Sequence, residues 1–371
     1  MALEVGAPGT VGPPVEGLLK TARRNEEKGY DAIWWPDHWM GWFPDSMWTP
    51  DVSPLAQYSP NPHIHLDPVA AIAAVGVHTD RIRLGTSVTE PIRRHPAMLA
   101  NEWLTLDHLT RGRAILGIGA GEAENITPYG MDFSKPASRF EEALAIIRLL
   151  WESDGPVDFD GDRWTLRDAV QGLGPYEAGR YPPIWTGARG PRMLDITGHL
   201  ADGWLPWYMP IDEFTSGLER IRAAATSAGR DPQAITPAMW CYVVTDEDHE
   251  ETHRLLGHRL PKSNLLILPS EAYDEAGYMH PLGPGFDGIR DYIPTRYGRE
   301  EILSAIDAIP EEFAHDRTLH GTPDELVKVA REYEAAGLRH IVLWNMTFFA
   351  DTSLVRQSFA LIDEVAAALK R

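Results

Sequence analysis

The chain has 371 residues, of which 54 are acidic and 34 basic, so its formal net charge at pH 7 is −20. A negative charge of this size repels phosphate backbones and anionic bilayers, and it argues against binding to nucleic acid. Hydrophobic residues make up 43% and charged residues 24% of the chain, which is typical of a folded globular protein.

The cysteine content and the N-terminal segment indicate in which cellular compartment the protein is expected. Cys241 is the single cysteine, so no intramolecular disulfide and no cysteine-based metal cluster can form. The chain has no basic start followed by a long apolar run, and no uncharged apolar stretch of about 18 residues occurs in it. We therefore expect a cytoplasmic protein that does not span a membrane.

Short apolar runs rich in β-branched and aromatic residues recur along the chain and alternate with longer amphipathic segments. The expected strands are residues 3–7, 31–35, 82–88, 113–118, 183–187, 202–205, 238–244 and 340–344. The amphipathic segments include residues 15–29, 67–79, 97–110, 137–152, 211–228 and 323–337. Eight such units predict a parallel sheet covered by helices and closed into a (β/α)8 TIM barrel.

Two stretches interrupt this alternation. Residues 153–182 contain a hairpin-like segment around Gly161, and residues 257–300 are rich in Pro, Gly, Tyr and His. We interpret both as insertions into a single domain spanning residues 1–371, because no internal repeat and no linker indicates a second domain.

The residues that follow each expected strand are the first candidates for a site, because the carboxyl ends of the strands form the active-site face of such a barrel. Asp37 and His38 follow the second strand. A histidine beside a carboxylate and desolvated by indoles can move a proton. A capping Asp with a structural His explains the pair equally well, but the surrounding tryptophans favour a pocket for a flat or apolar ligand. These are Trp34, Trp35, Trp39, Trp42 and Trp48.

Glycines and an acid follow the fourth strand. Gly117, Gly119 and Gly121 would let the backbone approach a ligand, and Glu122 comes next. The spacing differs from the dinucleotide-binding motif, so it does not indicate a Rossmann fold. Tight barrel packing, with Glu122 and Asn125 solvated in a loop, is the alternative interpretation.

The segment after the fifth strand favours an anion site. Gly187, Ala188, Arg189 and Gly190 lead into a helix that begins near Pro191, and backbone N–H groups at a helix start bind anions. Arg189 and Arg192 add positive charge to a strongly acidic protein. A phosphate site is therefore expected here, and a capped turn with two solvated arginines is the alternative.

Polar and charged residues also follow the third strand. Ser87, Val88 and Thr89 follow the third strand at the barrel mouth, and Arg93 and Arg94 come after them as an expected surface charge pair.

His63 and His65 have the H-x-H spacing of metal-dependent barrel hydrolases, but they lie in a Pro-rich loop without further ligands at other strand ends. We expect loop or pocket-lining histidines and no metal. The chain contains neither a G-x-S-x-G elbow nor a P-loop lysine motif.

Taken together, these segments resemble the luciferase-like superfamily of flavin and deazaflavin enzymes, and within it the branch that uses coenzyme F420. The resemblance rests on the ordered set WWPDHWMGW, IRLGTSVTEPIRRHPAMLA, LTRGRAILGIGAGEAEN, RFEEALAIIRLLW, PIWTGARGPRML and GTPDELV. Inside that branch, SKPASRFEEALAIIRLLW, AGRDPQAITPA and HPLGPGFDGIRDYIP are similar to the phthiodiolone ketoreductases. The resemblance implies a bulky, lipid-like or polyketide ketone as substrate, and relatives are usually homodimers.

The resemblance also implies catalytic roles for particular residues. His38 would exchange a proton with the substrate oxygen, Trp42 would flank the reacting carbon, and Glu122 would protonate the deazaflavin ring nitrogen. Asp37 would contact the ring system and help to orient His38.

Further residues would bind the coenzyme. Ser87 and Val88 match the position where the family has a cis peptide bond against the ring, and Thr89 lies beside them. Asn125 and the loop from Gly187 through Ala188 and Arg189 to Gly190 would hold the coenzyme's linker and phosphate. Arg189 stands where related dehydrogenases have a glycine.

Other functions stay open at this point. An FMN-dependent monooxygenase of the same superfamily is the main alternative, followed by a non-catalytic flavin-binding protein and a metal-dependent hydrolase. We expect segments 43–66 and 257–300 to select the substrate. Their candidate lining residues are Phe43, Trp48, Tyr58, Tyr278, Phe286 and Tyr292.

Overall fold

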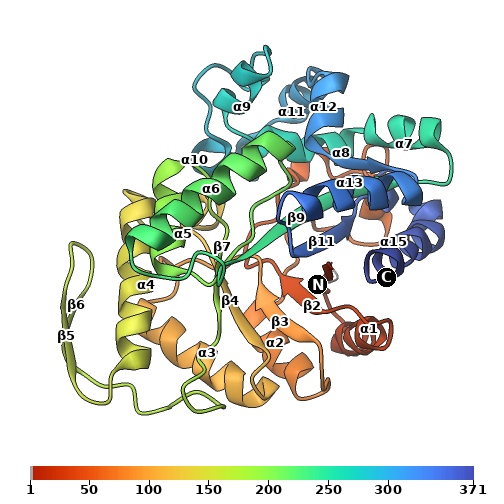
Figure 1. The fold of residues 1–371 in the computed structure, drawn as a ribbon. Helices are drawn as coiled ribbons and strands as arrows, with labels where there is room; N and C mark the ends of the chain where they lie inside the picture. Colours follow the sequence, from red (N-terminus) through yellow and green to blue (C-terminus); the bar gives the residue numbers. More distant parts are fainter. Residues whose placement is uncertain (1–2) are drawn as a thin grey trace.

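The computed structural model describes residues 3–371, and its main sheet is a closed barrel of eight parallel strands surrounded by helices (Figure 1). The neighbouring strands, in order around the barrel, are β1 (Glu4–Pro8), β2 (Ala32–Trp35), β3 (Arg83–Thr86), β4 (Ala114–Ile118), β7 (Ile184–Thr186), β8 (Gly203–Trp204), β9 (Thr236–Thr245) and β11 (His340–Asn345). β11 pairs back onto β1 and closes the barrel. The eight strands expected from the sequence are these eight, so the predicted TIM barrel is confirmed.

Helices follow the barrel strands and form the outer layer. They are α1 (Val15–Glu27), α2 (Pro68–Gly76), α3 (Pro96–Thr110), α4 (Pro136–Glu152), α5 (Pro191–Leu200), α6 (Ile211–Ser227), α13 (Pro323–Ala335) and α15 (Val355–Leu369). Apolar side chains of their inner faces pack against the strands. In α4, Phe140, Leu144 and Ile147 are fully buried, as the apolar stripe in the sequence predicts.

Large aromatic side chains fill the interior of the barrel. Trp34 of β2 and Trp185 of β7 lie with ring centroids 5.0 Å apart. Trp34 Nε1 donates a hydrogen bond to His340 Nε2 at 3.0 Å. A Cβ added at Gly85 of β3 would lie 2.6 Å from the Trp34 ring, so glycine is required opposite this indole. The barrel is therefore a packed core, and a ligand can enter only at its ends.

A ninth strand lies beside the barrel and was not expected from the sequence. β10 (Leu319–Gly321) pairs in parallel with Val243–Thr245, at the carboxyl end of β9. Three residues that include His320 and Gly321 carry no β signal of their own, so this strand depends on its partner.

The first insertion contains an antiparallel hairpin, β5 (Val157–Asp160) and β6 (Thr165–Ala169), which lies beside α4 (Figure 1). The Glu142 carboxylate of α4 accepts hydrogen bonds from the backbone N–H groups of Asp162 and Arg163 at 3.0 Å. The hairpin expected around Gly161 is thus present.

The second insertion, residues 257–300, lies within a series of short helices that follows β9. These are α7 (His249–Leu256), α8 (Arg259–Ser263), α9 (Ser270–Glu275), α10 (Gly288–Asp291), α11 (Arg299–Asp307) and α12 (Glu311–Arg317), with α14 (Thr347–Ala350) after β11. The 3-10 turns of the chain are η1 (Asp45–Met47), η2 (Pro54–Gln57), η3 (Ala123–Asn125), η4 (Thr127–Tyr129), η5 (Asn264–Ile267), η6 (Pro294–Arg296) and η7 (Thr352–Leu354). None of the helices within residues 3–371 has the length and apolar character that crossing a membrane requires.

Candidate active site

A pocket opens at the carboxyl end of the barrel. Segments that follow β2, β3, β4, β7 and β8 form its walls, and Ile289 of α10 contributes from the second insertion. The predicted site residues that line it are Asp37, His38, Trp42, Ser87, Val88, Thr89, Glu122, Asn125, Gly187 and Arg189. The structure thus brings together predicted site residues from four separate segments of the sequence.

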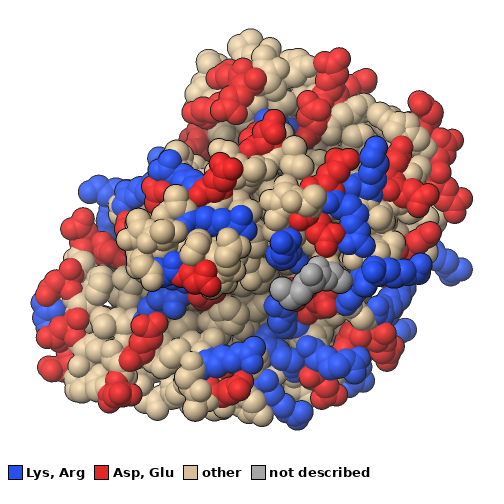
Figure 2. Space-filling model, in the orientation of Figure 1, with Lys and Arg blue, Asp and Glu red and all other residues tan. Residues whose placement is uncertain are grey.

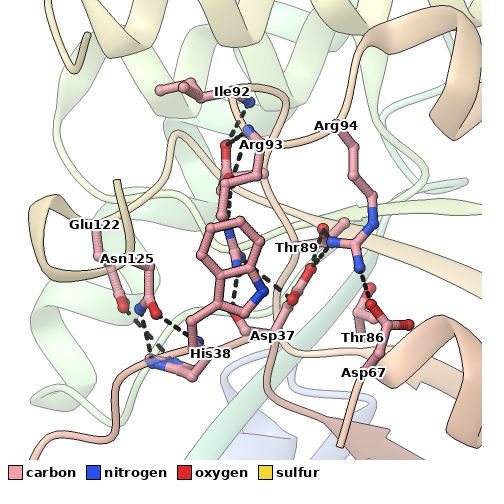
Figure 3. Close-up of polar contacts among 12 residues, drawn as sticks. Asp37, His38, Asp67, Thr86, Thr89, Ile92, Arg93, Arg94, Glu122 and Asn125 are labelled. Carbon is pink, nitrogen blue, oxygen red and sulfur yellow. Dashed lines mark hydrogen bonds and ion pairs between the residues drawn. The ribbon is translucent and has the colours of Figure 1, made fainter. Parts of the chain in front are cut away.

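His38 has different surroundings at its two ring nitrogens (Figure 3). Its side chain is 8% exposed. Nδ1 lies 3.0 Å from Glu124 Oε1, 2.9 Å from Asn125 Nδ2 and 3.2 Å from the Met40 carbonyl oxygen. Nε2 lies 3.7 Å from Glu122 Oε2. Because two of the three neighbours of Nδ1 are acceptors, we assign the Nδ1–H tautomer, with Nε2 available on the Glu122 side.

Asn125 fixes the loop that carries His38. Its Oδ1 accepts hydrogen bonds from the backbone N–H groups of Trp39 and Met40, at 2.7 and 3.0 Å. This contact settles the orientation of the amide, because Nδ2 must then point toward His38 and Glu124. Asn125 therefore holds the loop after β2 against the turn after β4.

Two acids lie around His38, of which Glu124 is buried and Glu122 is partly buried. Glu122 precedes η3, and burial raises the pKa of its carboxyl to about 7. Burial also raises the pKa of Glu124 well above its usual range. A carboxyl group with a pKa near 7 can hold or release a proton at neutral pH, as acid–base chemistry requires. Glu124 was not a candidate from the sequence; its place two residues after Glu122, within η3, was the available signal.

Asp37 is engaged with arginines. Its carboxylate accepts hydrogen bonds from Arg94 and, at 2.6 Å, from Thr89 Oγ1, while Arg93 Nη2 lies 3.3 Å from Oδ1 (Figure 3). The expectation that Asp37 orients His38 finds no support in these contacts. Glu124 and Asn125 occupy that position instead.

The expectation of a surface pair at Arg93 and Arg94 is wrong. Their side chains are only 2% and 9% exposed. Arg93 lines the pocket, donates to Glu90 Oε1 at 2.6 Å and lies 5.0 Å from the centre of the Trp39 ring. Both arginines are buried because the acids Asp37 and Glu90, also buried, need cationic partners.

Aromatic rings form one wall of the pocket. Trp42 meets the His38 ring edge-on at 5.3 Å and the Trp207 ring at 5.9 Å. Trp207 and Trp240 line the same pocket. Such a wall offers an apolar surface and keeps water away from His38.

Another part of the lining is formed by backbone and the Val88 side chain. The Ser87–Val88 peptide bond is cis, at the position that the resemblance implied. A Cβ added at Gly119 or Gly187 would lie 2.8 or 3.3 Å from Val88. Glycine at both positions therefore leaves room for the Val88 side chain, which forms part of the pocket surface.

The residues of the expected phosphate loop have different surroundings, and only some of them line the pocket. Gly187 and Arg189 line the pocket, whereas Ala188 is fully buried with its carbonyl accepting from Trp204 Nε1 at 2.9 Å. Gly190 has φ 74° and caps α5. Arg192 is more than half exposed and pairs with Glu141 at 3.0 Å, so the described contacts give it no part in the pocket.

The aromatic residues expected to select the substrate do not line this pocket. Phe43 stacks on Trp48 with ring centroids 5.3 Å apart, and Tyr58 is 77% exposed. Phe43, Trp48, Tyr278, Phe286 and Tyr292 instead pack in a second hydrophobic cluster formed with the short helices of the insertion. Leu205, Pro206, Trp207, Trp240 and Ile289 hold the apolar positions of the pocket.

The two histidines of the H-x-H segment have separate partners. His63 Nε2 lies 2.8 Å from Asp45, and its Nδ1 accepts from the Gly41 N–H at 3.1 Å. The His65 ring lies 5.6 Å from the His38 ring, and burial lowers the pKa of His65 to about 4. His65 is therefore a neutral neighbour of the proposed proton donor.

Comparison with known proteins gives a consistent picture. The sequence profile of the family described as Luciferase-like monooxygenase matches residues 2–340. The chain is 39% identical over 323 residues to the phthiodiolone/phenolphthiodiolone dimycocerosates ketoreductase of Mycobacterium tuberculosis, covering 85% of this chain and 84% of the relative. It is 29% identical over 235 residues to the 5,10-methylenetetrahydromethanopterin reductase of Methanolobus tindarius, covering 63% of each.

Among solved structures, an F420-dependent secondary alcohol dehydrogenase in complex with an F420-acetone adduct superposes with a TM-score of 0.77. The match covers all of both chains at 22% identity, so it shows that the two share a fold.

Proposed function

The chain belongs to the luciferase-like monooxygenase family, and on that basis we propose that it is an oxidoreductase that transfers hydride between coenzyme F420 and a ketone or secondary alcohol. The observation that carries the proposal is the pair formed by His38 and Glu122 at the pocket, 3.7 Å apart, in which burial raises the pKa of Glu122 to about 7. The 39% identity to a ketoreductase supports the reaction class.

The pocket fits a flat, anionic coenzyme. Five residues that line it each have a buried polar atom without a hydrogen-bond partner among the described residues: Trp42 Nε1, Ser87 Oγ, Arg93 Nη1, Arg189 Nη1 and Trp240 Nε1. Buried donors without partners are costly, so they favour a ligand that accepts hydrogen bonds. The two guanidinium groups provide positive charge in a protein with a net charge of −20.

We assign the binding of the coenzyme to the walls around these atoms. Ser87, Val88 and Thr89 would contact the ring system, and Asp37 holds this loop in place through Thr89 and Arg94. Asn125 and the loop from Gly187 to Gly190 would hold the linker and phosphate, with Ala188 and Gly190 acting through the shape of the backbone.

Bound coenzyme F420 supplies or accepts a hydride, and the protein handles the protons. In the direction of alcohol oxidation, the lone pair of His38 Nε2 would remove the proton from the hydroxyl of the alcohol. In the direction of ketone reduction, the same nitrogen would carry that proton, with the ring as imidazolium, and would give it to the carbonyl oxygen. Glu122 would hold the proton that belongs to the coenzyme's ring nitrogen. Trp42 would flank the reacting carbon, and orientation by such walls can contribute about 7–11 kcal/mol to a bimolecular step.

The lining indicates the substrate class. Trp207, Trp240, Leu205 and Ile289 present apolar surface to the pocket, and Trp207 lies beside Trp42. We propose a bulky, apolar ketone, lipid-like or polyketide in nature, as the substrate. A homodimer, a cytoplasmic location and a single domain over residues 1–371 stay predictions.

The experiment that tests the function is a titration of the purified protein with oxidised F420, followed by fluorescence quenching. We expect saturable quenching, and reduced F420 should then be consumed when apolar ketones are added under anaerobic conditions. FMN is the matched control, since an FMN-dependent monooxygenase is the alternative. Quenching by FMN without quenching by F420, or product that contains an oxygen atom from O₂, would contradict the proposal.

A further inference from the structure

A group of histidines lies outside the pocket, where the second insertion joins the barrel. It consists of His253 on α7, His315 on α12 and His320 on β10. One ring nitrogen from each of the three lies within 4.8 Å of the other two. Because His253 precedes the insertion and the other two follow α11, the group connects its two ends.

The hydrogen bonds leave these nitrogens directed at one another. His253 Nδ1 lies 3.0 Å from His315 Nε2. His320 Nδ1 lies 2.9 Å from the Thr318 carbonyl oxygen, so that nitrogen carries the hydrogen and Nε2 keeps a lone pair. In a tetrahedral zinc site with Zn–N bonds of about 2.0–2.1 Å, the ligand nitrogens lie only slightly further apart than the 3.0 Å seen between His253 and His315.

A fourth histidine contacts this group through His253. His249, one turn earlier on α7, lies with its Nε2 2.9 Å from His253 Nε2. The other nitrogen of His249 faces the Glu325 carboxylate at 3.0 Å. This carboxylate–histidine relay would fix the His253 ring with Nδ1 toward His315, as outer partners of metal-ligating histidines do.

The charge around the group favours a cation. Figure 2 shows acidic side chains gathered on the part of the surface formed by α7, α11 and α12. The negative charges of Glu311 and Asp316 interact electrostatically with His315. Those of Asp248, Glu250 and Glu325 interact in the same way with His249.

We propose that His253, His315 and His320 bind one zinc ion, which joins α7, α12 and β10 at the base of the second insertion. Three imidazole ligands are a donor set that zinc accepts, with water in the fourth position. Since α10 of this insertion reaches the pocket through Ile289, the ion would stabilise the segment that borders the substrate.

The test uses the full chain, stripped of metal with a chelator and titrated with zinc chloride against a chromophoric zinc indicator. We expect one equivalent of zinc per chain, and at least 100-fold weaker binding for both His253→Ala and His315→Ala. His78→Ala is the matched control, because His78 is exposed and its ring contacts only the Ala74 carbonyl among the described residues. Binding that is absent in the wild type, or unchanged in both variants, would overturn the proposal.

A second readout separates this site from the pocket and from loss of folding. His38, Glu122 and Glu124 also lie close enough together to contact one cation. Glu124→Gln should keep the zinc; loss of zinc in that variant with retention in His253→Ala would place the ion in the pocket and refute the proposal. Zinc should also raise the unfolding temperature of the wild type and slow proteolysis within residues 257–310, and it should do neither in His253→Ala.

Discussion

At the scale of single residues, the chemistry depends on His38 and on what surrounds each of its nitrogens. Nδ1–H donates toward Glu124 and the Met40 carbonyl oxygen, so the imidazole cannot rotate freely, and Nε2 stays on the side of Glu122. A proton donor held in this way needs no reorganisation when the substrate binds.

Replacing His38 should lower turnover much more than it weakens the binding of the coenzyme. We expect His38→Ala to lower the turnover of a ketone by about 10²–10⁴-fold, the usual contribution of a positioned acid or base. The affinity for F420 should change by less than about threefold, because the proposed coenzyme contacts come from other segments. Steady-state kinetics and fluorescence titration measure the two effects. Equal turnover in the variant and the wild type would remove His38 from the mechanism, and His78→Ala serves as the control.

The raised pKa of Glu122 predicts a dependence on pH. In the direction of alcohol oxidation Glu122 gives up a proton, so the active form is the protonated one, which dominates below about pH 7. The rate of alcohol oxidation should therefore fall as the pH rises through about 7. Glu122→Gln should be slower and should lose this decline. A profile of the same shape in the variant would show that another group is responsible.

At the scale of elements, the coenzyme loop depends on how α5 packs. This helix begins directly after Gly190 and packs against α6. Gly198 of α5 makes the close approach possible, since a Cβ there would lie 2.4 Å from the Ile221 carbonyl oxygen and 2.6 Å from Ala224 Cβ. The contact between Gly198 and α6 therefore helps to set the position of the loop that precedes α5.

Gly198→Ala should lower the free energy of unfolding by about 1–3 kcal/mol, because the added methyl group overpacks the contact with α6. Gly17→Ala is the matched control: an added Cβ at this position of α1 meets nothing within 4 Å. The control should be neutral or stabilising by up to about 1 kcal/mol. Denaturant unfolding of the two variants measures the difference. Similar stabilities would mean that the two helices can move apart without cost.

At the scale of the whole molecule, the partly buried acid Glu122 in the pocket lowers stability at neutral pH. The folded-state pKa of Glu122 is about 7 against an ordinary value of 4.5. Below pH 4.5 the carboxyl is protonated in both states and the cost is absent. Between these values the unfolded chain releases its proton first, so the folded state loses stability as the pH rises, by up to about 3 kcal/mol in total.

Glu122→Gln should therefore stabilise the protein at pH 8 while leaving its stability at pH 4 unchanged. Thermal unfolding at several pH values measures this, and Glu219→Gln on the exposed face of α6 is the control. A constant difference between variant and wild type across the range would show that the pKa of Glu122 is not raised in the fold. A more stable variant with poorer turnover would identify Glu122 as a residue kept for function.

Much of this organisation was determined by the sequence alone. Alternating apolar runs and amphipathic segments are local patterns, and they predicted the eight barrel strands and the hairpin around Gly161. His38, Trp42 and Glu122 follow strand ends, and parallel strands bring their carboxyl ends together, so their presence in one pocket also followed from the sequence.

Only the tertiary structure decided which side chains contact one another. Glu124 faces His38, Arg93 and Arg94 are buried, and the aromatic residues of the second insertion pack away from the pocket, because partners distant in the chain supply the charge and apolar surface each of them needs. β10 and the three-histidine group arise in the same way. Their residues carry no local signal, since a short strand or a ligand set is stabilised by neighbours that only the closed barrel brings within reach.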